Sequence, residues 1–170
     1  ALRQSGFSKN GAIGALANMS HESGWISHMI GYNSSYFIGY GERSAESLLN
    51  LMDSATSRQD LYAKIQGTSK DGNPTGYGLT QFTSQENIGN LYEYHKATGL
   101  SYDKLGVQIP AFIKVLQDNG YWNETNSSAS PGEAAYYLCI KYERPANMYT
   151  EAAKRRVEAD NLAAKYAFYD

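Results

Sequence analysis

Glu22 lies on the apolar stripe of a predicted helix, where a carboxyl group could carry acid chemistry. Ala15 and Met19 precede it at helical spacing, so its side chain is expected to turn toward an apolar face. Burial disfavours the charged carboxylate, and so do the unpaired carbonyl groups at the helix end before Gly24. We therefore expect Glu22 to keep its proton and to be able to protonate the leaving oxygen of a glycosidic bond. A surface Glu at a helix end is the plainer alternative.

A second carboxylate would decide how such a bond is cleaved. Hydrolysis by two acids places them about 5 Å apart for retention and about 6.5–9.5 Å apart for inversion. Asp71 is the first candidate and Glu42 the second, although both lie in turn-rich segments, where acidic residues are common for structural reasons. Without a partner, Glu22 would act first as acid and then as base, with a group of the substrate itself as internal nucleophile.

Other kinds of chemistry find little support in the residue pattern. His21-Glu22 lacks the second histidine of a zinc-protease helix, because position 25 is Trp25. The chain has neither a phosphate-binding glycine loop after a strand nor a nucleophile elbow, and we expect no metal and no cofactor. Cys139 is the single cysteine and lies in an apolar run, which favours a small buried side chain over a nucleophile.

The elements that would position these groups are mostly helices. Ser8 and Gly24 delimit the helix predicted over 9–23, and the turn-forming residues 70–78 followed by alternating side chains at 79–83 predict a small β-hairpin. Short helices are expected after Ser44 and Ser57. Longer ones are predicted over about 85–97, 110–119, 131–142 and 150–166, the last with Val157 on its inner face and Arg155 outside.

Composition and charge narrow the class of protein. The chain has 170 residues, and a hydrophobic fraction of 42% suits one globular domain over 1–170. A net charge of −2 disfavours binding to nucleic acid. The sequence has no run of about 18 apolar residues, so we expect no membrane insertion. The 15 tyrosines suit sugar binding, but half-buried packing explains most of them equally well.

Two short motifs together resemble a known family. The segment His21-Glu22-Ser23-Gly24-Trp25, followed by Gly76-Tyr77-Gly78-Leu79-Thr80-Gln81-Phe82, resembles the paired signatures of lysozyme-like peptidoglycan hydrolases. In those enzymes a helix ends in Glu-Ser and a hairpin carries Gly-Leu-x-Gln. The chain is most similar to the phage tail lysozyme family, which is related to goose-type lysozymes and soluble lytic transglycosylases. The similarity runs over nearly the whole chain and includes Tyr142-Glu143-Arg144-Pro145-Ala146, followed by Arg155 or Arg156.

This resemblance implies a fold and a set of site residues. The fold would be mainly α and lysozyme-like, with about seven helices and one small β-hairpin beside the cleft. Glu22 would be the catalytic acid, and Gly78, Leu79 and Gln81 would form the floor of the glycan cleft. Glycines at 76 and 78 would let the backbone approach a sugar, and Gln81 offers a donor and an acceptor to an N-acetyl group. A tight hairpin without a ligand is the alternative.

The resemblance also concerns the aromatic residues. Tyr136 and Tyr137 resemble the late Ala-Tyr motif of soluble lytic transglycosylases, in which a tyrosine approaches the catalytic Glu. Helical geometry lets at most one of them face the cleft. Five further aromatic side chains are candidate sugar platforms, with loop packing as the alternative for each: Trp25, Tyr32, Tyr36, Tyr40 and Tyr77.

The function implied is cleavage of the β-1,4 bond between N-acetylmuramic acid and N-acetylglucosamine, with peptidoglycan strands as substrate. The expected setting is extracellular or on a virion, in a domain excised from a larger tail or cell-wall protein, beside other phage tail domains. A lytic transglycosylase acting on the same bond is the nearest alternative. A non-catalytic glycan-binding module is the next, and a stem-peptide peptidase the most distant.

Overall fold

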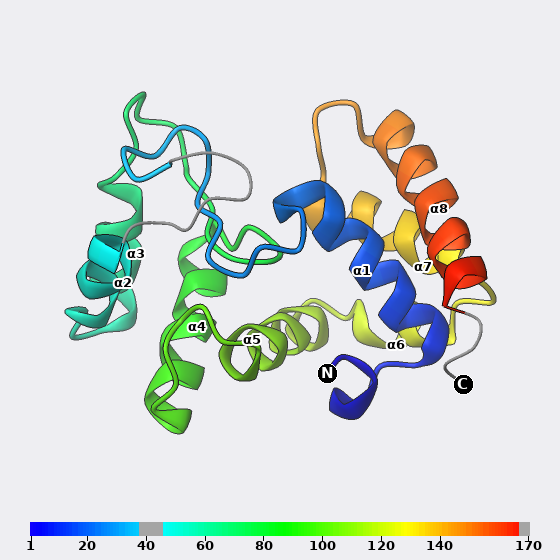
Figure 1. The fold of residues 1–170 in the computed structure, drawn as a ribbon, viewed down its shortest axis with the longest axis horizontal. Coiled ribbons are helices and arrows are strands. Elements are labelled where there is room, and N and C mark those ends of the chain that lie inside the picture. Colours follow the sequence, from blue (N-terminus) through cyan, green and yellow to red (C-terminus); the bar gives the residue numbers. More distant parts are fainter. Residues whose placement is uncertain (38–45, 167–170) are drawn as a thin grey trace. The chain divides into compact units, whose positions relative to one another are not determined.

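Helices make up almost all the regular structure in this computed structural model, which describes residues 1–37 and 46–166 (Figure 1). The helical prediction is confirmed, although the described residues hold eight α-helices where about seven were expected. In chain order they are α1 Lys9–Ser23, α2 Glu46–Asp53, α3 Arg58–Gln66, α4 Gln85–Thr98, α5 Leu105–Asp118, α6 Trp122–Ser127, α7 Pro131–Leu138 and α8 Met148–Lys165. A 3₁₀-helix, η1, covers Arg3–Ser5, and a π-helix, η2, covers Cys139–Glu143.

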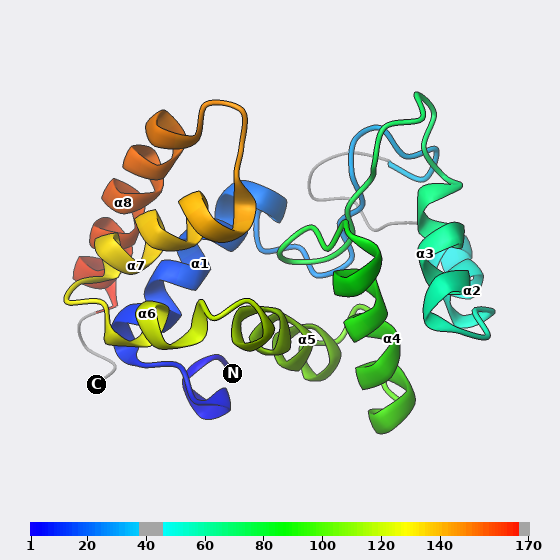
Figure 2. The ribbon, with the colours of Figure 1, turned by 180° about the vertical axis from the view of Figure 1, so that it is seen from behind.

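The chain forms two compact units. One unit combines Ala1–His21 with Leu116–Asp170, and the other is Glu22–Val115. In the first, α7 packs along α8, as both ribbon views show (Figures 1 and 2). In the second, α3 packs against α4.

Small side chains form the centre of the first unit. Ala17 of α1, Ala135 of α7 and Ala159 of α8 are fully buried in one cluster. A Cβ added at Gly14 would lie only 2.6 Å from the Cβ of Ala134. Helix α1 therefore lies close to α7 because neither helix has a bulky side chain at this contact.

A buried arginine joins the helices of this unit, contrary to the sequence prediction. Arg155 is 3% exposed, and its Nη1 donates to Asn18 Oδ1 at 2.7 Å. Asn18 Nδ2 in turn donates to the carbonyl oxygen of Ala135 at 3.0 Å. The prediction that Arg155 lies outside is wrong, and so is the prediction for Val157, which is 59% exposed. The buried stripe of α8 runs through positions 152, 155 and 159, and position 157 lies on the opposite side of the helix.

Local capping signals explain the helices of the second unit. The Ser57 hydroxyl accepts from the backbone N–H of Asp60, and the Ser84 hydroxyl accepts from that of Asn87, so α3 and α4 begin where the sequence predicted. Ser44, the expected start of the preceding helix, lies outside the described residues.

Three features of the helices differ from the prediction. Helix α5 begins at Leu105, so Pro110 lies inside it, where its missing N–H removes one helical hydrogen bond. Helix α6 was not predicted. The helix expected over 131–142 ends at Leu138 and continues as the π-helix η2. At that junction, the Cys139 side chain is fully buried, as predicted.

Candidate functional site

Helix α1 has the bounds that the sequence predicts, and Glu22 lies in its last turn. The Ser8 hydroxyl accepts from the backbone N–H of Gly11 at 3.0 Å and caps the helix start. Ala15 and Met19 are 0% and 3% exposed, so the stripe that leads to Glu22 is buried. Glu22 itself is half-buried and is the last residue but one of the helix. Its carboxyl group thus belongs to a side chain at the border between core and surface.

A strained backbone follows Glu22. Gly24 has φ = 59° and ends the helix, and Trp25 has φ = 63°, in the left-handed region that a bulky residue rarely adopts. The Trp25 side chain is nonetheless held at the surface, 47% exposed. Such strain persists only where the surroundings enforce it, and it clusters at functional sites.

The predicted hairpin is not confirmed as a pair of strands. Tyr77 and Phe82 form one isolated antiparallel bridge, in which the N–H of Tyr77 donates to Phe82 O at 3.1 Å and that of Phe82 to Tyr77 O at 2.8 Å. The four residues between them form a turn, with φ = 85° at Gly78 and φ = 47° at Gln81. The alternating pattern at 79–83 therefore belongs to a chain reversal, named here the 77–82 turn.

Ser23 joins this turn to the end of α1. Its hydroxyl donates to the carbonyl oxygen of Leu79 at 2.9 Å, and the Ser23 side chain is fully buried. The loop after α1 holds the turn at a second point, because the N–H of Gly78 donates to Met29 O at 2.7 Å. The residue next to Glu22 is thus bonded to the segment that the sequence predicted as the cleft floor.

The predicted floor residues are fixed mainly by contacts within the protein. Gln81 Nε2 donates to Gly78 O at 2.9 Å and to Met29 O at 3.3 Å, which leaves Oε1 as the group of this amide without a partner among the described residues. A Cβ at Gly76 would lie 2.9 Å from atoms of Gln81, and a Cβ at Gly78 would lie 2.7 Å from Gln108 Oε1. Both glycines are therefore required by the packing of the turn itself.

Asp71 holds a loop together. Its Oδ1 accepts from the N–H of Asn73 at 3.0 Å, from Ser69 Oγ at 3.0 Å and from Asn33 Nδ2 at 3.2 Å. These bonds, that from Asn73 first, hold the pKa of the exposed Asp71 carboxyl well below its usual range. Asp71 is therefore an ionised group. Glu42, the other predicted candidate, lies outside the described residues.

The predicted aromatic residues differ in exposure. Tyr32 is 75% exposed and Tyr36 is half-buried, whereas Tyr40 lies outside the described residues. Tyr77 is fully buried, and burial raises the pKa of its phenol. Its ring therefore packs in the core beneath the turn.

Tyr136 and Tyr137 belong to the first unit. The Arg156 guanidinium lies over the Tyr136 ring, 4.5 Å from its centroid. The Tyr137 ring meets that of Tyr121 edge to face at 6.2 Å, and burial, with the nearby Glu124 carboxylate, raises the pKa of Tyr137. The two rings thus have different partners, as their helical positions require.

Sequence reasoning missed Gln108, which is 1% exposed and bonds to three separate segments. A signal for it existed in the sequence. Gln108 is four residues before Phe112 and seven before Val115, on the apolar stripe of α5, where a polar side chain requires partners.

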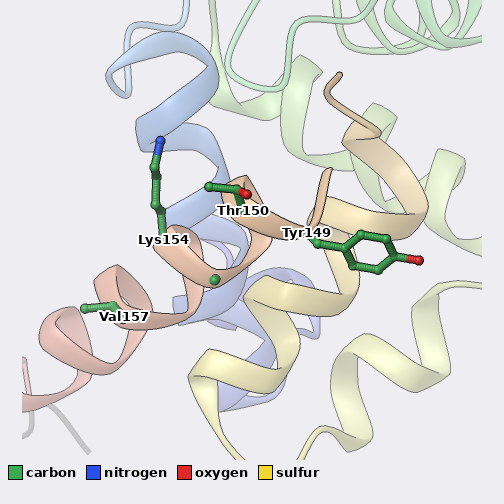
Figure 3. A pocket seen from close by; sticks show the side chains of 5 residues that line it. Tyr149, Thr150, Lys154 and Val157 are labelled. Carbon is green, nitrogen blue, oxygen red and sulfur yellow. The ribbon is translucent and has the colours of Figure 1, made fainter. Parts of the chain in front are cut away.

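Three further features would bear on function among the described residues: a surface depression, a metal-binding group and a membrane-spanning helix. An open depression on α8 is lined by Tyr149, Thr150, Ala153, Lys154 and Val157, and the four labelled side chains diverge from one another (Figure 3). The described residues contain no group of three or more side chains suited to hold a metal ion. None of the described helices combines the length and apolar character needed to cross a membrane.

Comparison with known proteins identifies the family. No curated protein and no solved structure matches the chain. The sequence model of the phage tail lysozyme family, in contrast, matches residues 1–166. This family implies peptidoglycan-lytic activity, with action on the cell wall in the context of a phage tail. Since the match covers nearly all of its length, the chain belongs to the phage tail lysozyme family.

Proposed function

We propose that this chain cleaves the β-1,4 bond between N-acetylmuramic acid and N-acetylglucosamine, with Glu22 as the general acid. The observation that carries the proposal is the bond from Ser23 to Leu79, which fixes the 77–82 turn next to Glu22. A general acid must lie within hydrogen-bond reach of the leaving oxygen, so its position relative to the bound sugar has to be fixed.

The turn supplies the polar contacts in this proposal. Gly78 and Leu79 form the floor, and Gln81 Oε1 accepts a hydrogen bond from the N–H of an N-acetyl group, because its amide nitrogen is already used within the turn. Trp25 is 47% exposed and offers its aromatic side chain to a sugar. Tyr77 supports the floor from the core.

Asp71 is the second carboxylate in the two-acid form of the proposal. Its lowered pKa suits the ionised partner, which acts as base or nucleophile while Glu22 acts as acid. The hydrogen bonds to Oδ1 leave Oδ2 for this role.

The same hydrogen bonds favour a second candidate function, a lytic transglycosylase. They give Asp71 a sufficient structural role in its loop, in which case Glu22 acts alone as acid and base. The products separate the two functions, since mass spectrometry distinguishes a reducing end from a 1,6-anhydro ring by one water molecule.

Glu22→Gln tests the general acid. General acid catalysis contributes a factor of about 100 to 10,000, so we expect clearing of a cell-wall suspension to fall at least about 100-fold. The matched control is Glu46→Gln, an exposed Glu in the first turn of α2. Wild-type clearing by Glu22→Gln would refute the assignment. Retained wall binding, with no clearing by the wild-type chain either, would identify a glycan-binding module instead.

A further inference from the structure

We propose that Gln108 is a positioning residue for glycan cleavage, which fixes the floor of the site from the side of α5. The inference rests on the proposed function, because it concerns the same 77–82 turn. Gln108 does not touch the reacting atoms in this proposal. It acts through Leu79, whose place relative to Glu22 it holds.

The carboxamide of Gln108 joins three segments of the second unit. Its Oε1 accepts from the backbone N–H of Leu79 at 2.8 Å. Its Nε2 donates to the carbonyl oxygen of Tyr102 at 2.8 Å and to that of Ser27 at 2.5 Å. The side chain is 1% exposed, so water does not replace these partners. One amide therefore ties the loop after α1, the turn and the segment before α5 to one another.

The chemistry of the partners fixes the orientation of this amide. A backbone N–H faces Oε1, and two carbonyl oxygens face Nε2, so a flipped amide would place like groups together at all three contacts. Neither an apolar side chain nor a carboxylate can satisfy this set. The amide group of glutamine supplies both the acceptor and the two donors that the site requires.

Leu79 is held on both sides of its backbone. Its N–H donates to Gln108, and its C=O accepts from Ser23, the residue after Glu22. The absence of a side chain at Gly78 allows this arrangement, since a Cβ there would lie 2.7 Å from Gln108 Oε1. Gln108 and Ser23 thus set the place of the floor relative to the acid, and neither of them needs to contact the sugar.

Gln108→Met tests this role, because methionine has a similar volume and no comparable hydrogen-bonding group. A misplacement of about 1 Å at a catalytic site can cost about 100-fold in rate. We expect kcat per folded molecule on soluble glycan strands to fall by about that factor, with a much smaller change in KM. Gln117→Met, at an exposed position of the same helix, is the matched control and should retain wild-type kinetics.

A conservative variant separates positioning from simple destabilisation. In Gln108→Glu, the protonated carboxyl can accept from Leu79 and donate to one carbonyl, whereas the ionised form faces two carbonyl oxygens with no donor. The activity of this variant relative to wild type should therefore rise as the pH falls. A lower folded fraction without a positioning role would leave kcat per folded molecule at the wild-type value.

Hydrogen exchange supplies a readout that needs no variant and no activity. The Leu79 amide should exchange slowly in the wild-type chain, because it is bonded to a buried acceptor. Fast exchange at Leu79 would overturn the geometry, and wild-type kcat in Gln108→Met would overturn the positioning role. Activity retained in Glu22→Gln would instead refute the proposed function, so the two failures are distinguishable.

Discussion

Ser23→Ala is the sharpest test of how the acid-bearing helix is joined to the turn. The substitution removes a fully buried hydroxyl and takes from the Leu79 carbonyl oxygen a donor that lies 2.9 Å away. Removing one partner of a buried hydrogen bond costs about 1–3 kcal/mol of unfolding free energy. Because Ser23 is fully buried, we expect Ser23→Ala to lose about 2 kcal/mol. At about 2–4 °C per kcal/mol for a chain of this size, Tm should fall by about 4–8 °C.

The effect on activity should exceed the effect on folding. Leu79 loses the bond that joins it to the residue after Glu22, so we expect the rate of wall clearing per folded molecule to fall by about 10- to 100-fold. Thermal melts followed by circular dichroism give Tm, and turbidity of a wall suspension, measured well below Tm, gives the rate.

Ser54→Ala is the matched control for this prediction. Its hydroxyl also donates to a backbone carbonyl, that of Leu51 at 2.7 Å, but in an exposed position. Its loss should change the unfolding free energy by no more than about 0.5 kcal/mol. If Ser23→Ala has the same Tm and the same rate of wall clearing as Ser54→Ala, the bond to Leu79 contributes neither to stability nor to activity, which would refute the prediction.

Three further perturbations follow from the structure. Asn18→Ala removes the Oδ1 acceptor that lies 2.7 Å from Nη1 of the buried Arg155. Hydrogen bonds to charged groups contribute about 1.5–3 kcal/mol, so the free energy of unfolding in urea should fall by at least that amount. An unchanged urea midpoint would contradict this prediction. The lowered pKa of Asp71 means that its ionised form stabilises the fold fully above about pH 4, and that this stability is lost as the pH falls further. Asp71→Asn should therefore flatten the fall of Tm between about pH 4 and pH 2, and an unaltered acid slope would refute this. Val157→Ser, on the exposed face of α8, should leave Tm and wall clearing unchanged, and a marked loss of either would show that this face is covered.

The parts that could be predicted from sequence depend on local signals. Helix α1 has its cap at Ser8, its apolar stripe and its glycine stop within 17 residues, so its bounds and the place of Glu22 follow from short-range rules. The small hairpin expected from 70–83 is not confirmed, because Gly78 and Gln81 adopt left-handed conformations, which turn the chain where alternation favours extension.

The parts that could not be predicted depend on distant partners. Gln108 bonds to Leu79 across 29 positions and to Ser27 across 81, and no local pattern specifies such pairs. Arg155 looked like a surface residue because its partner, Asn18, is 137 positions away. Burial of a charged side chain is decided by whether a partner reaches it, which is a property of the tertiary structure.

The single thiol of the chain, that of Cys139, is buried at the junction between α7 and η2. Cys139 is completely shielded, and η2 packs against both α7 and α8, so a thiol reagent can reach the sulfur only when this part of the protein opens. The rate of labelling with a chromogenic disulfide would thus report the opening equilibrium of the first unit in the unmodified chain. No probe would have to be introduced, and each variant above could be compared on the same scale.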